Sequence, residues 1–147
     1  MNRVLFREHC FKMLFDMDFY PETEKKEQID LYFEQIREDE FDSKGEPKIL
    51  HEVVFDEFDK AEAKERVEDC NTHLEEIDTK LEAAIEGWNF DRLPKIEKAI
   101  LRLAYYEMKY VDSIPEAVAI NEAINLAKKF GGDDSSSFIN AILGKLV

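Results

Sequence analysis

The last third of the sequence, residues 88–147, constrains the fold more than any other part of the chain. Apolar side chains recur there every three or four residues, a spacing that places them on one face of an α-helix. Pro94 falls near the start of the first such run, and Gly131 and Gly132 follow the second. With only 5 Gly and 4 Pro among 147 residues, the chain lacks the turns of a many-stranded protein. The sequence therefore predicts an all-α fold.

Individual residues mark where these helices start and stop. Asp91 is a candidate N-cap, and Pro94 is tolerated in the first turn that follows it. Residues 113–116 predict a capping box, in which a serine hydroxyl and a glutamate carboxylate satisfy free amides at the helix start. Residues 131–132 are predicted to end that helix in a left-handed conformation, and residues 133–137 offer caps for the last helix.

The first part of the chain adds further helices and one irregular segment. The spacing of apolar residues predicts helices over 3–17, 22–37 and 60–86, the last dividing into two near residues 73–76. Residues 38–47 are predicted to be a loop, and residues 48–58 fit either a helix or an extended segment. We expect about seven helices in one domain, 1–147, made of two packed sub-bundles, 1–74 with an acidic loop near 38–58, and 75–147.

The net charge of −14 is unevenly distributed. Residues 22–86 hold 23 acidic and 9 basic side chains, and the rest of the chain holds 11 of each. Near the amino terminus Arg3, Arg7 and Lys12 outnumber the single acid Glu8. Since the field of a charge is screened within about 10 Å, a local basic patch can attract phosphate despite a distant acidic surface. The acidity weakens a nucleic-acid hypothesis without excluding it.

No catalytic centre is predicted. The sequence lacks a dinucleotide fingerprint, a phosphate-binding loop and a nucleophile elbow, and its three histidines lie far apart. Cys10 and Cys70 have no metal-site spacing and are expected to be reduced, partly buried side chains. We therefore expect no enzyme activity, no metal and no cofactor. No signal peptide or membrane span is predicted, so the expected location is cytoplasmic.

Two features allow a binding function. Arg3 and Arg7 are four residues apart on one helical face, and the long side chain of Lys12 reaches the same side. Phe130 and Phe138 flank a serine-rich turn, and Phe138 is placed at the start of a helix where it can stack on an unpaired base.

Several long blocks in the carboxyl-terminal half resemble the NusB family of bacterial transcription antitermination factors. Arg3, Arg7 and Leu14-Phe15 fall where that family has its arginine-rich first helix, whereas residues 21–60 resemble nothing in particular. The blocks are I-D at 77–78, W-N-F-D-R-L at 88–93, I-L-R-L-A-Y-Y-E-M at 100–108, V-A-I-N-E-A-I-N-L-A-K-K-F-G at 118–131 and D-D-S-S-S-F-I-N-A-I-L at 133–143.

The resemblance implies an all-α fold of two sub-bundles and a role without enzyme activity. It implies pairing with NusE, a small-subunit ribosomal protein, and binding of boxA single-stranded RNA in nascent ribosomal RNA transcripts. The resulting complex would act on elongating RNA polymerase, which the chain would contact indirectly. Carried over by motif, the RNA-binding residues are Arg3, Arg7, Lys12, Phe15, Asp134 and Phe138, and the NusE-binding residue is Glu97.

The sequence departs from the family pattern at Val4 and Leu5, where members often carry further arginines. Fewer phosphate contacts release fewer counterions, so we expect weak RNA binding without NusE. Two alternatives stay open. One is a helical protein-interaction module without an RNA role. The other is the NusB-like domain of a ribosomal RNA cytosine methyltransferase, for which these residues supply neither a glycine-rich cofactor motif nor a suitable nucleophilic cysteine.

Overall fold

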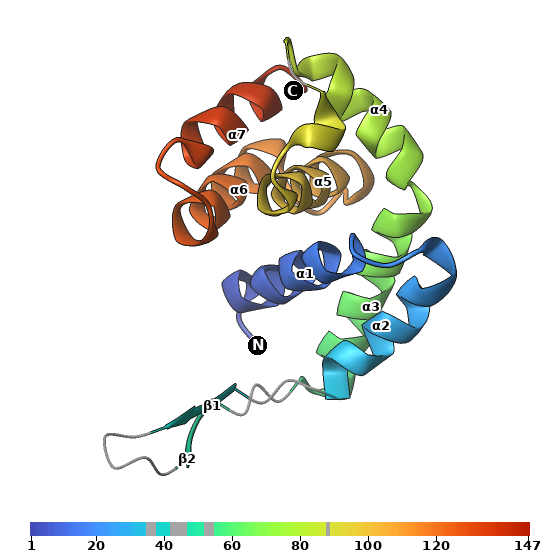
Figure 1. The fold of residues 1–147 in the computed structure, drawn as a ribbon, viewed down its shortest axis with the longest axis vertical. Coiled ribbons are helices and arrows are strands. Elements are labelled where there is room, and N and C mark those ends of the chain that lie inside the picture. The colour runs from blue at the N-terminus through green and yellow to red at the C-terminus, as the bar shows by residue number, and fades with distance from the viewer. Residues whose placement is uncertain (35–37, 42–46, 52–54, 88) are drawn as a thin grey trace.

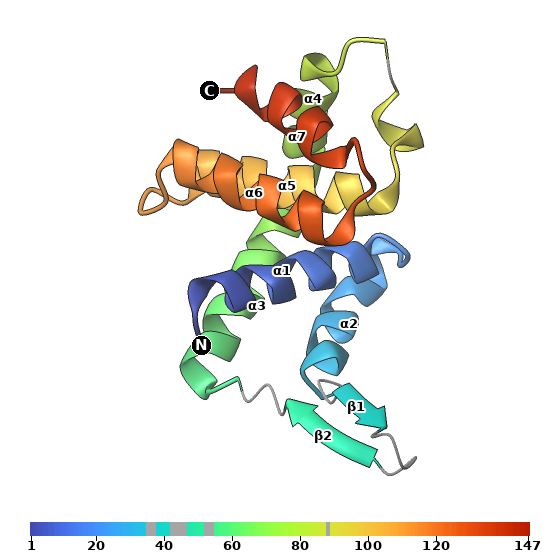
Figure 2. The ribbon, with the colours of Figure 1, turned by 90° about the vertical axis from the view of Figure 1, so that its left-hand side faces the viewer.

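Helices make up most of the structure (Figures 1 and 2). The computed structural model describes residues 1–34, 38–41, 47–51, 55–87 and 89–147. Within these residues the helices are α1 Arg3–Met17, α2 Glu22–Glu34, α3 Glu57–Thr72, α4 Leu74–Ala84, α5 Lys95–Tyr110, α6 Glu116–Phe130 and α7 Ser135–Gly144, with a 3-10 turn, η1, at Phe90–Arg92. The all-α prediction is confirmed.

Two predicted boundaries agree closely with the structure. The helix α1 has the bounds expected from the apolar spacing, and Asn2 caps it by accepting the Leu5 amide at 2.8 Å. The long helical segment divides as predicted, because α3 ends and α4 begins at His73. The predicted helix over 22–37 is described only as far as Glu34, since residues 35–37 lie outside the described residues.

The segment predicted as a loop contains a short antiparallel hairpin, which corrects that expectation. Its strands are β1 Glu38–Phe41 and β2 Pro47–His51, paired with Glu38 opposite His51 and Phe41 opposite Pro47. The segment 48–58, left open between helix and strand, is therefore extended through His51, and α3 begins at Glu57. Main-chain pairing between strands needs no helical periodicity, which is why the apolar spacing did not reveal it.

Two helix starts differ from the prediction. Asp91 does not cap α5; it lies within η1, where its amide donates to Asn89 Oδ1 at 3.0 Å. The capping box does not form either, because Pro115 precedes α6 and no side chain bonds to its free amides. Proline at this position fixes a backbone angle close to that of a helix, so the chain enters α6 without the serine.

The turn after α6 is extended rather than left-handed. Gly131 has φ −91° and ψ 179°, values open to any residue, and so the predicted left-handed helix end is wrong. Space explains the glycine instead: a Cβ there would lie 2.6 Å from Ser135 Cβ and 2.8 Å from the Ala127 carbonyl oxygen. Asp134 precedes α7 and accepts the Phe138 amide through its backbone carbonyl at 3.1 Å, but its side chain makes no capping bond, which corrects its predicted role as a side-chain cap.

The helices form two groups that share α1. In Figure 2, α2 and α3 lie on one side of α1, and α5, α6 and α7 lie on the other. The helix α5 is central and is buried continuously from Lys98 to Met108. Two packed sub-bundles are therefore present as predicted. The boundary between residues 74 and 75 stays a prediction, because α1 also packs on α5.

A cluster of charges joins the end of α1 to α4 and α5. Buried Arg102 donates to Asp78 at 2.8 Å from two nitrogens and to Asp18 Oδ1 at 3.0 Å. Lys95 Nζ donates to Asp18 Oδ2 at 2.7 Å. Burial alone would raise the pKa of Asp18, but hydrogen bonds from Lys95 and Arg102 outweigh it and lower the pKa to about 2.

This low pKa predicts a stabilisation that depends on pH. Because the folded-state pKa of Asp18 lies below its unfolded value, its contribution is complete above pH ~4 and is lost as pH falls towards about 2. We expect Asp18→Asn to lower the free energy of unfolding by up to about 2 kcal/mol at pH 7, a figure reduced by partial solvent screening. Urea unfolding at pH 7, 4 and 2.5 should show this difference shrinking.

A matched control lies two residues earlier, on α1. Burial raises the pKa of Asp16, so Asp16→Asn should leave the free energy of unfolding at pH 7 unchanged or higher. A difference for Asp18→Asn that stays constant down to pH 2.5 would contradict the role given to Asp18.

Candidate nucleic-acid interface

Arg7 points into the protein rather than towards solvent. Its Nε donates to both carboxylate oxygens of Glu107 on α5, at 2.9 and 3.1 Å, and its Nη1 lies 3.7 Å from Glu122 on α6. Arg7 is 7% exposed and Glu107 is 1% exposed. The expectation that Arg7 holds phosphate stays a prediction, and it would require a phosphate to displace the buried carboxylate partners of the guanidinium.

Arg3 is exposed but also has a carboxylate partner. Its two terminal nitrogens donate to Glu62 on α3 at 2.5 and 2.9 Å, and this bonding raises the pKa of Arg3. Arg66 lies 3.8 Å from Glu62 and 3.6 Å from Glu107, and so connects Arg3 to Arg7. The predicted basic patch is instead a neutral arginine–glutamate network, in the order Arg3, Glu62, Arg66, Glu107, Arg7 and Glu122.

Lys12 lies further along α1, beside the end of α6. Its Nζ is 5.8 Å from the centre of the Phe130 ring, and the Phe11 and Phe130 ring centres are 5.1 Å apart. Lys129 reaches the same ring, at 5.4 Å, and its Nζ donates to Glu8 at 2.6 Å. The structure thus gathers two lysines around Phe130. Lys129 is not among the residues predicted from the sequence, although K-K-F in the last turn of α6 was the available signal.

Phe15 belongs to a row of phenylalanine rings along α1. Its ring centre is 6.5 Å from that of Phe11 and 5.4 Å from that of Phe19. We call Phe130, Phe11, Phe15 and Phe19 the aromatic row. Phe11 is buried, whereas Phe15 and Phe130 are half-buried and Phe19 is 59% exposed, so parts of the row face solvent.

Asp134 and Phe138 lie at the start of α7, directly after the turn that follows Phe130. Asp134 is exposed and Phe138 is half-buried against the core. Since α6 packs on both α5 and α7, this turn is held next to the aromatic row rather than projecting freely. The structure therefore places Lys12 and the α6–α7 turn around one aromatic contact, and leaves Arg3 at the other end of α1.

Glu97 is half-buried in the first turn of α5, near the far end of the aromatic row. Two residues before it, Lys95 holds its Nζ 4.8 Å from the centre of the Phe19 ring. The row thus runs from Phe130, at the end of α6, to Phe19, beside the first turn of α5 that holds Glu97.

In the described part of the chain, no three His, Cys, Asp or Glu side chains are grouped so that they could hold a metal ion. No helix among the same residues is long and apolar enough to cross a membrane. Cys10 and Cys70 are fully buried free thiols, deeper than expected, and burial raises the pKa of each to about 12.

Comparison with known proteins identifies the family. A model described as the NusB family matches residues 5–147. The chain belongs to the NusB family. It is 42% identical over 147 residues to the transcription antitermination protein NusB of Lachnoclostridium phytofermentans, covering 100% of this chain and 99% of that protein. It is 36% identical over 145 residues to the NusB of Agathobacter rectalis, covering 99% and 98%.

Solved structures of NusB proteins have the same fold. The NusB structure from T. maritima matches with a TM-score of 0.77 and 29% identity, covering 99% of this chain and 90% of that one. A crystal structure of antitermination factors NusB and NusE in complex with dsRNA matches with a TM-score of 0.76 and 22% identity, covering 99% and 97%. At that identity the second match supports the fold alone.

Proposed function

We propose that this chain is a transcription antitermination factor that pairs with a NusE-type ribosomal protein and binds boxA-type single-stranded RNA in nascent ribosomal RNA transcripts. Its effect on elongating RNA polymerase would be exerted through that complex. The proposal is supported by NusB-family membership and by a NusB relative whose structure contains NusE and RNA. The relatives named above are antitermination proteins rather than methyltransferases, which disfavours the enzymatic alternative.

The observation that carries the RNA part is the meeting of α1 and the end of α6 at the Phe130 ring, with α7 beginning five residues further along the chain. Lys12 and Lys129 supply ammonium groups there, and half-buried Phe138, eight residues after Phe130, supplies a further ring. Single-stranded RNA is bound by stacking bases on aromatic rings and by pairing phosphates with cations. Exposed Asp134 can accept a hydrogen bond from the amino group of a stacked base.

The electrostatics support weak binding by the chain alone. Lys129 is paired with Glu8 and Lys95 with Asp18, and the arginine–glutamate network is internally balanced. A phosphate must therefore compete with carboxylates, so that few counterions are released and the salt dependence is shallow. NusE would supply the missing affinity. We place its contact at Glu97 and the adjoining end of the aromatic row.

The test is a titration of fluorescent boxA RNA with the chain, with and without NusE, at two salt concentrations. We expect Phe138→Ala to raise the Kd about 5-fold to 100-fold, because stacking on one base contributes about 1–3 kcal/mol. Phe58→Ala is the matched control, since Phe58 is 84% exposed on α3 away from this surface and should leave the Kd unchanged.

The RNA and NusE functions can be separated in the same assay. Glu97→Ala should weaken capture by immobilised NusE and leave the Kd for RNA alone unchanged. If Phe138→Ala and Phe58→Ala behaved alike, the proposed RNA surface would be wrong. If the wild-type chain failed to retain RNA even with NusE bound, the alternative of a protein-interaction module would replace the RNA function.

A further inference from the structure

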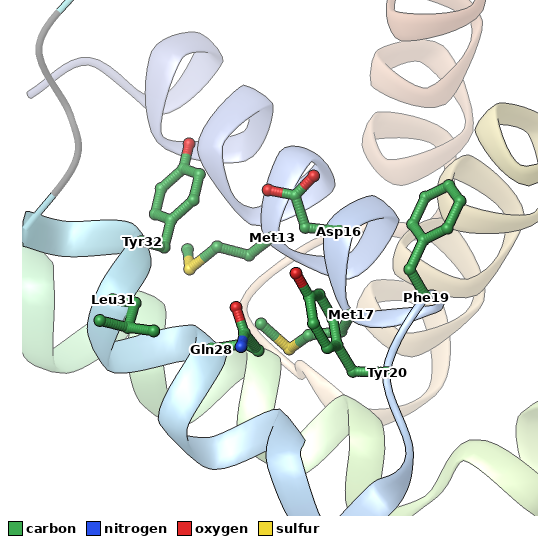
Figure 3. Close-up of a pocket in the computed structure, with 8 residues that line it drawn as sticks. All are labelled: Met13, Asp16, Met17, Phe19, Tyr20, Gln28, Leu31 and Tyr32. Carbon is green, nitrogen blue, oxygen red and sulfur yellow. The ribbon is translucent and has the colours of Figure 1, made fainter.

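The helices α1 and α2 enclose a hollow that shares only Phe19 with the surface proposed above for RNA and NusE (Figure 3). Met13, Asp16 and Met17 line it from α1, and Gln28 and Leu31 line it from α2. Its volume is about 240 Å³. That is below the roughly 300–1,000 Å³ of pockets that hold drug-sized ligands or cofactors. The hollow has room for one or two side chains.

The lining suits an apolar side chain. Met13 and Met17 are buried, and Figure 3 shows their thioethers between the two helices. Methionine adapts its shape to different neighbours and is common on surfaces that accept partners. At the α1–α2 turn Phe19 is 59% exposed and Tyr20 is 38% exposed, and both line the hollow. Exposed aromatic side chains beside a hollow are typical of sites that anchor a protein partner.

Most of the charge around the hollow is negative, although Lys12 lies near Asp16 and Lys25 lies three residues before Gln28. Asp16 is the one charged side chain among its lining residues, and burial raises the pKa of this carboxyl. On α2, Glu24, Glu27 and Glu34 are exposed and lie three or four residues from Gln28 or Leu31, on neighbouring positions of the helix surface. A partly desolvated carboxylate beside an acidic face attracts a cation.

We propose that this hollow docks a basic segment of another protein. The segment inserts one aliphatic or aromatic side chain between α1 and α2 and places a lysine or arginine against Asp16. A second copy of this chain is disfavoured because each copy carries a net charge of −14. RNA is disfavoured at this hollow because Asp16 and the exposed glutamates of α2 would repel its phosphates locally. In Figure 2, α2 and the α6–α7 turn lie on opposite sides of α1, so the inference does not rest on the proposed RNA function.

The experiment uses the ¹⁵N-labelled chain and a synthetic twelve-residue peptide of lysine and arginine with two leucines. NMR titration should shift amides of residues 13–20 and 28–31 at micromolar peptide. A peptide with alanine in place of both leucines should bind at least tenfold more weakly. An acidic peptide that keeps the leucines should not bind.

Variants of the chain then locate the contact. Asp16→Lys should weaken binding about tenfold, and Leu31→Ala should do so without any change in charge. Glu82→Lys makes the same charge change on an exposed position of α4 and should have less than a twofold effect. Equal effects of Asp16→Lys and Glu82→Lys, shifts spread over all acidic helices, or no binding at 1 mM peptide would each overturn the proposal.

Discussion

Replacing Arg7 by alanine is expected to lower the free energy of unfolding by about 3–5 kcal/mol, the cost of removing one partner of a buried ion pair. The cost is large because Glu107 is 1% exposed and, of the cations in the described residues, would keep only Arg66 near its charge, at 3.6 Å. Urea unfolding followed by circular dichroism measures the effect. The midpoint should fall while the slope stays constant.

Arg3→Ala is the matched control for this prediction. Arg3 lies four residues away on the same helix and is also paired with a glutamate, but its side chain is 57% exposed. Exposed ion pairs contribute about 0–1 kcal/mol, so Arg3→Ala should lower the free energy of unfolding by no more than about 1 kcal/mol. A cycle with Glu107→Ala and the double variant would isolate the coupling between Arg7 and Glu107. Equal losses for Arg3→Ala and Arg7→Ala would refute a structural role for Arg7.

Replacing Arg102 by alanine is expected to have a comparable effect, again about 3–5 kcal/mol. Arg102 is 6% exposed and donates three hydrogen bonds, to Asp18 at the end of α1 and to Asp78 on α4. Removing it leaves two carboxylates close together, with Lys95 and Lys98 near only the first of them. We expect the melting temperature to fall by about 10 °C or more.

Two further variants show whether the charge of Arg102 or the geometry of its guanidinium is responsible for the stabilisation. Arg102→Lys keeps the positive charge but loses the planar fork that binds Asp78 through two nitrogens, so it should recover only part of the loss. Arg92→Ala removes an exposed arginine on η1 and should be close to neutral. Full recovery by lysine would show that the bidentate geometry contributes nothing.

The helices could be predicted from the sequence because their signal is local. Apolar residues spaced for one helical face identified α1, and the length of the helical segment after residue 60 indicated the division of α3 from α4. The ends were less predictable, since more than one local device can start or stop a helix. Pro115 starts α6 without the capping box, and Gly131 is explained by the closeness of Ser135 rather than by its own backbone angle.

The candidate site could be predicted only in part, because its electrostatics depend on residues far apart in the sequence. The sequence places Arg3 and Arg7 on one helical face, but it does not show that Glu107, one hundred residues later, meets Arg7. Phe138 was predicted from the family motif, and Lys12 was predicted from its position on the first helix, close to the face that carries Arg3 and Arg7. Lys129 could be selected only from the structure, which shows its ammonium group beside the Phe130 ring where the end of α6 lies next to α1. The RNA and NusE contacts stay predictions until they are measured.

The position of α1 between the two groups of helices affects how the chain is made. Synthesis proceeds from the amino terminus at about 5–20 residues per second, so α1 leaves the ribosome several seconds before its α5 partners exist. During that interval its apolar face and Arg7 have no completed core to enter. We therefore expect folding to finish late in translation, with the first helix to be synthesised among the last to be fixed in place.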